Sequence, residues 1–262
     1  MIIEATTKIW YDHLRDIIAF GTEEQPRGMP TLAVYDKQLT FYAAKPVVMS
    51  EARKLNYRFM MAEAYWILSG DNTVAGIAPW NSNISQFSDD GVTFWGAYGP
   101  RIRSQTGHVI KSLRQDRHTR QAVLTIWDPS PPKTKDVPCT LVATFRIDAA
   151  NVLHQHVMMR SSDAWLGLPY DVFNFAMLQT WIAYETGCTL GKLTYTLVNA
   201  HLYEQHWDLA SRIVTADSGT YFDDQPAINA GNLDFIELIR FLQDCRDQKS
   251  SKAALHAWMG LS

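Results

Sequence analysis

Cys139 lies in the stretch Val137-Pro-Cys139-Thr, where a loop passes into an apolar run typical of a strand. A thiolate is a soft nucleophile that adds to conjugated electrophiles, so a cysteine here can form a covalent intermediate. Considered alone, the residue is better explained as a small buried apolar side chain, because single cysteines are usually that. Other residues must decide whether Cys139 is catalytic.

Two carboxylates stand in apolar surroundings. Glu63 lies in the apolar run 60–66, where burial would raise its pKa and let it move protons through water; the alternative is an ordinary helix-surface Glu. Asp171 ends the stretch 167–171, just before a strongly apolar helical run. It can be the N-cap of that helix or a ligand-binding group, and the same oxygens cannot easily serve both roles.

Three arginines and a His–Tyr pair could contact a ligand, although each also has an ordinary structural explanation. Arg27, Arg120 and Arg160 offer planar, bidentate donors that suit a phosphate, although each alone would be a solvated surface residue. His201 and Tyr203 are two apart in a predicted strand and therefore point to the same face, as ordinary sheet residues also do.

The elements that must position these side chains alternate irregularly, which favours an α+β fold with one large sheet. Without repeats or a linker, a single domain is predicted over residues 1–262. Helices are predicted at 5–20, 50–68, from 109 to 115, 172–186 and 234–247; strands at 121–127, 140–146, 152–159 and 193–202, with a hairpin over 32–42 that turns at Asp36-Lys37; and irregular segments at 21–30, 74–106 and 129–138.

Composition excludes several classes of protein. The net charge of −3 argues against a broad nucleic-acid surface. No apolar run approaches the ~20 residues that span a bilayer, and the first residues do not resemble a signal peptide. The three cysteines are too few for a disulfide framework, and no Cys/His spacing suits a metal. We therefore expect a cytoplasmic protein without a metal.

Several motifs together resemble the thymidylate synthase family over about residues 5–210, in that family's order, while residues 216–262 show no match. Similar segments are Glu63 in E-x-x-W-x-x-x-G-D, Tyr98 in a Tyr-Gly pair, Arg120 in D-x-x-T-R, Cys139 after Pro138, Arg160, Ser161 and Asp163 in R-S-x-D, Gly167, Tyr170 and Asp171 in L-G-x-P-Y-D, and His201 and Tyr203 in H-x-Y.

This resemblance implies an α+β fold built on a large twisted mixed sheet flanked by helices, and a homodimer that packs sheet against sheet. It implies a pyrimidine nucleotide as substrate and 5,10-methylenetetrahydrofolate as one-carbon donor. The implied roles are catalysis by Cys139, Glu63, Tyr98 and Asp171; nucleotide binding by Arg27, Arg160, Ser161, His201, Tyr203 and the Arg120 of the second subunit; and folate binding by Asp163, Gly167, Tyr170, Ile84 and Phe87.

Asp171 is the departure that bears most on the product. The family has Asn here, whose amide matches the N3–H donor and O4 acceptor of uracil. Cytosine presents the reverse pattern, which a neutral Asp can match, as can an ionised Asp with N3-protonated cytosine. The resemblance is therefore nearest the branch that hydroxymethylates cytidylate, and most like the CMP enzymes of nucleoside-antibiotic biosynthesis.

Other departures concern the phosphate and the folate. Gln121 replaces a second Arg, Thr140 follows the cysteine in place of His, and the segment 84–87 stands where the family usually carries two Trp. Losing those Trp suits hydration of a methylene intermediate over its reduction. CMP is set slightly ahead of dCMP, with Ala176 and Lys133 as residues that help admit a ribose. Alternatives are dUMP hydroxymethylation, thymidylate synthesis, cytidylate methylation and a non-catalytic nucleotide-binding role.

Overall fold

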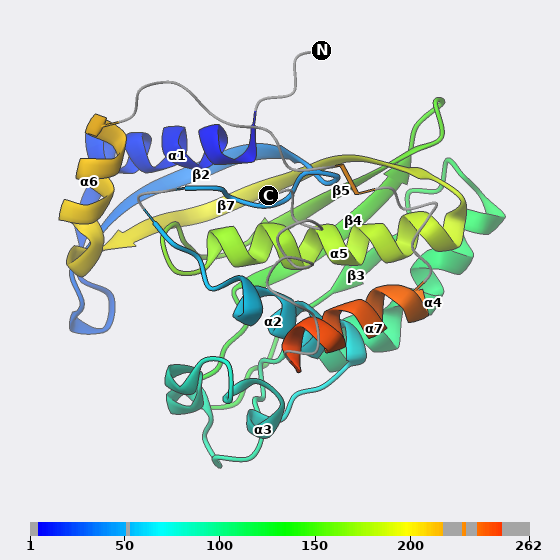
Figure 1. Ribbon diagram of the computed structural model, residues 1–262, viewed down its shortest axis with the longest axis horizontal. Helices are drawn as coiled ribbons and strands as arrows, with labels where there is room; N and C mark the ends of the chain where they lie inside the picture. The colour runs from blue at the N-terminus through cyan, green and yellow to red at the C-terminus, as the bar shows by residue number, and fades with distance from the viewer. Residues whose placement is uncertain (1–4, 51–52, 217–226, 229–234, 248–262) are drawn as a thin grey trace.

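The protein is described by a computed structural model that covers residues 5–50, 53–216, 227–228 and 235–247. Its elements lie in a mixed order around one large sheet (Figure 1). In chain order they are α1 (Thr6–Phe20), β1 (Thr22–Glu24), η1 (Pro26–Gly28), β2 (Thr31–Tyr42), α2 (Tyr57–Ser69), α3 (Val74–Ile77), η2 (Ser82–Phe87), α4 (Tyr98–Gln115), β3 (Val123–Thr125), β4 (Thr140–Ile147), β5 (Val152–Met159), β6 (Ser162–Asp163), α5 (Leu168–Thr186), β7 (Thr189–Tyr203), η3 (Glu204–His206), α6 (Trp207–Ala216) and α7 (Phe235–Arg246).

The sheet is mixed, which confirms the predicted α+β class. Its strands run in the order β1-β2-β7-β5-β4-β3, and β6 adds a short pairing to β7. The β2–β7 and β4–β5 pairs are antiparallel, whereas β5 and β7 are parallel. In Figure 1 the apolar helix α5 lies along the sheet, with α2, α4 and α7 beside it and α1 near α6 by the β2 end. The long strand β7 contributes core residues along most of its length, and His201 and Tyr203 lie at its C-terminal end.

The hairpin predicted over residues 32–42 is wrong, because β2 is one continuous strand. Both of its halves pair with β7, and the ladder skips Asp36 and its opposite residue Val198. Asp36 takes a left-handed backbone (φ 53°), a conformation that Asp tolerates better than most residues. A turn-forming residue here interrupts the ladder without reversing the chain.

Three predicted boundaries also move. The second helix begins at Tyr57, where the Asn56 side chain accepts the N–H of Phe59, and not near residue 50; its predicted end at Gly70 (φ 83°) is confirmed. The irregular segment is shorter than 74–106, because α4 already begins at Tyr98. The loop 21–30 contains β1 and η1.

Helix α5 begins at Leu168 and has Gly167 as its N-cap residue. Asp171 lies inside the first turn, with its backbone N–H donating to the carbonyl of Gly167 (3.0 Å). The N-cap role considered for Asp171 is therefore wrong. Its carboxyl group does not cap the helix and can contact a ligand.

His13, on the buried face of α1, has a buried imidazole. Its side chain is 1% exposed, and neither ring nitrogen has a hydrogen-bond partner among the described residues. Burial lowers the pKa of His13 to about 4, and the Lys37 cation acts in the same direction while Asp16 opposes it. The ring is neutral in the folded protein at pH values where an unfolded chain would bind a proton.

Replacing His13 by Leu is expected to make the protein more resistant to acid. The unfolded His takes up a proton below pH 6.5 and the folded one only below about 4, so wild-type stability falls as the pH drops through this window, by about 3 kcal/mol in total. Urea unfolding at pH 7 and 4.5 measures the difference. The exposed His118→Gln variant should retain the wild-type pH dependence; an equally steep loss in His13→Leu would contradict the assignment.

Candidate active site

The loop before β4 presents Cys139, and Arg160 holds it from the end of β5. The Arg160 guanidinium donates to the carbonyls of Pro138 (Nε, 2.9 Å) and Val137 (Nη2, 2.9 Å). The same Nη2 lies 3.9 Å from Sγ of Cys139, and the Arg160 backbone N–H donates to the Cys139 carbonyl (2.9 Å). Arg160 thus fixes the loop and places a cation beside the thiol.

The protonation of Cys139 reflects opposing surroundings. Burial raises the pKa of the thiol, and Asp171 and Asp136 raise it further, whereas the cations of Arg160 and Arg27 lower it. Those two arginines therefore favour ionisation of the Cys139 thiol, whereas burial and the two carboxylates oppose it.

Tyr98, the first residue of α4, lies on the other side of this loop. Its phenol oxygen accepts the backbone N–H and the hydroxyl of Thr140, both at 3.1 Å. Burial raises the pKa of Tyr98 well above its usual value, and Cys139 and Asp171 add to the effect. The phenol therefore stays neutral, and its hydrogen can be donated to a ligand.

Glu63 projects from α2 toward α5. Its Oε2 accepts a hydrogen bond from Nδ2 of Asn174 (2.7 Å). Burial raises the pKa of Glu63 to about 7, and the bond from Asn174 partly opposes that rise. Such a carboxylate exchanges protons near neutral pH, as a general acid–base requires.

Asp171 is a second carboxyl group of the site whose pKa is raised. Burial raises the pKa of Asp171 well above its usual value, and the negative charges of Glu63 and Asp163 raise it further. Its Oδ2 lies near Gly167, where an added Cβ would come within 3.5 Å of it. Its backbone carbonyl accepts the hydroxyl of Tyr195 (2.9 Å), which fixes this turn of α5 to β7. The side chain is therefore held as a neutral carboxyl group.

Further donors converge from β7 and η1. The rings of His201 and Tyr203 are neighbours on one face (centroids 5.2 Å apart), as predicted. Arg27 is exposed in η1 with a left-handed backbone (φ 55°), and its charge acts on both Tyr203 and Cys139. Ser161 is partly exposed next to Arg160. The charge of Arg27 and the phenol of Tyr203 both act near the thiol of Cys139.

Arg120 is not part of this group. It is exposed in the turn after α4, and the charges that act on Cys139 within the described part of one chain come from Arg160, Asp171, Asp136 and Arg27.

The segment from β6 to the first turn of α5 carries three of the predicted folate contacts, Asp163, Gly167 and Tyr170. Asp163 Oδ1 accepts the N–H groups of Trp165 and Leu166 (both 2.8 Å), while Oδ2 accepts none from the described residues. Tyr170 packs its ring on Phe59 (5.2 Å) and accepts the Asn56 N–H (3.1 Å). One carboxylate oxygen beside an aromatic ring suits a flat heterocycle with N–H donors. Ile84 and Phe87 lie apart from this segment, on η2, and Phe87 is exposed.

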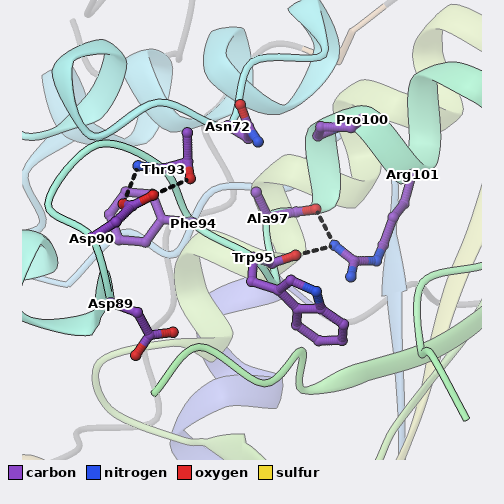
Figure 2. A pocket seen from close by; sticks show the side chains of 9 residues that line it. All are labelled: Asn72, Asp89, Asp90, Thr93, Phe94, Trp95, Ala97, Pro100 and Arg101. Atoms are coloured by element: carbon purple, nitrogen blue, oxygen red, sulfur yellow. Dashed lines mark hydrogen bonds between the residues drawn. The ribbon is translucent and has the colours of Figure 1, made fainter. Parts of the chain in front are cut away.

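A cavity of about 390 Å³ lies next to the thiol loop (Figure 2). Arg101 lies over the indole of Trp95 (4.7 Å) and donates to the Trp95 carbonyl (2.6 Å). The adjacent Gly96 N–H donates to Asp136 (2.7 Å), three residues before Cys139. The irregular segment that carries Ile84 and Phe87 thus also places an indole, that of Trp95, at this cavity. The cavity is lined by Asn72, Asp89, Asp90, Thr93, Phe94, Trp95, Ala97, Pro100 and Arg101.

No described helix is long and apolar enough to cross a membrane. No cluster of three or more His, Cys, Asp or Glu side chains in the described ranges could hold a metal ion.

Comparison with known proteins agrees with this geometry. The sequence profile of the family described as "Thymidylate synthase" matches residues 8–225. A protein named "Deoxyuridylate hydroxymethyltransferase", from Pseudomonas phage M6, is 31% identical over 196 residues, which cover 71% of this chain and 56% of that protein. The chain thus spans little more than half the length of this relative. Because the family profile covers most of the sequence, the chain belongs to the thymidylate synthase family.

Proposed function

We propose that the protein transfers a one-carbon unit to C5 of a cytidine 5′-monophosphate and hydrates it, giving the 5-hydroxymethyl nucleotide. The observation that carries the choice of base is the carboxyl group of Asp171, which burial and two neighbouring carboxylates keep protonated. A neutral carboxyl offers one O–H donor and one carbonyl acceptor. Cytosine presents an acceptor at N3 and a donor at N4, so the two edges match.

The proposed chemistry begins at Cys139. Its thiolate adds to C6 of the base, and the electron pair of the C5–C6 double bond moves to C5, which becomes nucleophilic. Methylenetetrahydrofolate supplies the one-carbon unit. Glu63, with a pKa raised to about 7, would exchange the protons that leave C5 and enter with water. Expulsion of the Cys139 thiolate then restores the aromatic base. Because no hydride is needed, folate leaves without oxidation.

The nucleotide would be held by the group around the thiol. Nη1 of Arg160 donates to no described residue, and the exposed Arg27 guanidinium is close enough to act on the thiol, so both can bind a phosphate. Ser161 would add a hydroxyl donor, and His201 with Tyr203 would bind the sugar. Asp163, Gly167 and Tyr170 would contact the folate, with Ile84 and Phe87 at its outer side.

The second candidate is hydroxymethylation of deoxyuridylate, the activity named for the phage relative. A protonated Asp171 would match uracil only with its proton on the other oxygen, so that the O–H donates to O4 and the carbonyl oxygen accepts the N3–H. The sugar is less constrained. Ala176 is fully buried on α5 and Lys133 is exposed in the loop before Cys139, and CMP stands only slightly ahead of dCMP.

Competition among CMP, dCMP and dUMP tests the assignment. The protein is incubated with methylenetetrahydrofolate and all three nucleotides, and products are resolved by mass. We expect the mass gain of a hydroxymethyl group on a cytidylate, release of tritium from its C5, and no dihydrofolate absorbance. Product from dUMP alone would overturn the cytosine assignment, dihydrofolate would indicate a methyl product, and no product from any nucleotide would favour a binding protein.

We also propose a homodimer that packs through the outer face of the sheet. Leu193, Tyr195 and Leu197 of β7 point into the core, so Thr194, Thr196 and Val198 point outward. Val198 is 40% exposed, and Met158, which pairs with Thr196 from β5, is 37% exposed. A partly apolar sheet face of this kind is usually covered, and a second copy would bring the exposed Arg120 to its neighbour's thiol.

Mixing two inactive variants tests the shared site. Arg120→Ala and Cys139→Ala are each expected to be nearly inactive. After subunit exchange between equal amounts, about half of the dimers are mixed, and each mixed dimer has one complete site. Activity should therefore return to about a quarter of the wild-type value. Activity is measured before and after mild denaturation and refolding of the mixture. An active Arg120→Ala variant, or no recovery on mixing, would contradict donation across the interface.

A further inference from the structure

Asn174 is a buried amide that none of the roles above uses. It lies on α5 one turn after Asp171, is 5% exposed, and donates from Nδ2 to Oε2 of Glu63 (2.7 Å). Its Oδ1 is buried and has no partner among the described residues. A buried acceptor left unpaired costs about 1–3 kcal/mol, which a purely structural residue could avoid by being apolar.

The surroundings of Asn174 limit what Oδ1 can accept. Position 174 falls on the same side of α5 as Asp171, because residues three apart on a helix are neighbours. One side of the amide is occupied by Glu63, and the helix around it is otherwise apolar, with Val172, Phe173 and Phe175 all buried. A small donor with two hydrogens would satisfy Oδ1 and the carboxylate of Glu63 together, and water is that donor.

We infer that Asn174 is a positioning residue that orients Glu63 through Nδ2 and, through Oδ1, seats the water that becomes the hydroxyl group of the product. This rests on the proposed function. A water held by Oδ1 of Asn174 and the carboxylate of Glu63, with one lone pair directed at the methylene carbon, would account for a hydroxymethyl product.

The step balances without an oxidant or a reductant. The oxygen of the seated water forms a bond to the exocyclic methylene carbon, and one of its protons passes to Glu63. The electron pair of the exocyclic double bond moves to C5. That pair then restores the C5–C6 double bond as the C6–S bond breaks, and Cys139 leaves as a thiolate.

Two variants of similar size separate the two functions of Asn174. Asn174→Leu removes both the donor and the acceptor, whereas Asn174→Asp keeps an oxygen acceptor but adds a third carboxyl group beside Glu63 and Asp171. The matched control is Thr180→Val. Thr180 is fully buried on α5, and among the described residues its hydroxyl donates only to the helix carbonyl of Ala176 (2.8 Å). Circular dichroism and nucleotide binding verify folding for each.

Three readouts follow from the inference. In Asn174→Leu, kcat should fall by about 10- to 100-fold with nucleotide KM within about threefold, as for loss of a hydrogen bond to a charged group. The rate of tritium release from C5 falls at low pH as Glu63 becomes protonated, and this fall (the acid limb) should occur at higher pH in both variants. The hydrogen bond that lowers the pKa of Glu63 is lost in both, and the Asp variant adds a second carboxyl group beside it. With 2-mercaptoethanol present, Asn174→Leu should divert product from the hydroxymethyl nucleotide to the thioether; Asn174→Asp should divert less.

Each outcome decides one question. If Asn174→Leu matches Thr180→Val in kcat, acid limb and product partition, the inference is overturned. If the Leu variant does not fold, the isosteric Asp variant carries the test through its acid limb, and an unmoved limb overturns the orienting role. If the wild-type protein makes no hydroxymethyl product at all, the proposed function fails instead, which the competition experiment shows independently.

Discussion

Asp171→Asn is expected to reverse the base preference from cytosine to uracil nucleotides. The amide Nδ2 and Oδ1 match the O4 acceptor and N3–H donor of uracil, whereas the protonated carboxyl of Asp171, with its proton directed at N3, matches the opposite pattern of cytosine. A site built for one hydrogen-bond pattern rejects the other strongly, because buried groups are left unpaired. The ratio of kcat/KM for CMP over dUMP should therefore change by about 10³- to 10⁴-fold.

The measurement is kcat/KM for CMP, dCMP and dUMP with wild type, Asp171→Asn and Asp163→Asn. Asp163 is a carboxylate on the same segment whose Oδ1 caps the turn at Trp165 and Leu166. Its substitution is expected to weaken turnover of every nucleotide while leaving the order of bases unchanged. A variant Asp171→Asn that still prefers cytosine would show that another group selects the base.

The residues around the thiol could be predicted from the sequence because each is marked by local chemistry. Cys139 and Arg160 lie where a strand begins or ends, and the structure joins them through hydrogen bonds that need no other element. His201 and Tyr203 follow from the two-residue period of a strand. The sequence places Asp171 at the start of the apolar helix, which the structure confirms, whereas the N-cap alternative is wrong because Gly167 takes that position.

Other features depend on contacts between distant segments and left no local signal. Asp36-Lys37 resembles a turn, yet β2 continues because β7, which lies far along the chain, pairs with both halves. Gly99 resembles a loop residue, yet it lies within α4. A glycine is needed there because a Cβ would come 2.5 Å from the Asp71 carbonyl oxygen. In these cases the residue type serves packing or pairing and not a turn.

Asn174 was missed for a different reason. It stands in the most apolar helix, where the residues on either side indicate only burial. The signal that could have found it is spacing: a polar side chain three positions after Asp171 falls on the same side of α5. The position of Arg120 could not be tested in the same way, because its proposed partner is a second copy of the chain.

Cys139→Ala is expected to abolish turnover and covalent complex formation while leaving nucleotide binding within about threefold, because the arginines that would bind the phosphate are untouched. Cys188→Ala is the matched control.

Cys188 also lies beside a guanidinium, with its Sγ 3.3 Å from Nη2 of Arg117, but it is 4% exposed and its thiol donates to Asn151. An adjacent arginine therefore does not distinguish the two thiols. What distinguishes Cys139 is its place beside Asp171, Tyr203 and Arg27.

The comparison uses a 5-fluorinated cytidylate with methylenetetrahydrofolate. Fluorine blocks loss of the C5 substituent as a proton, so the bond from Cys139 to C6 should persist and raise the protein mass by nucleotide plus folate. Wild type and Cys188→Ala should show this adduct and Cys139→Ala should not, with activity lost by about 10⁴-fold or more in the last. An adduct that survives Cys139→Ala, or one lost in Cys188→Ala, would assign the nucleophile elsewhere, because only Cys139 is acted on by the charges of both Arg160 and Arg27 among the described residues.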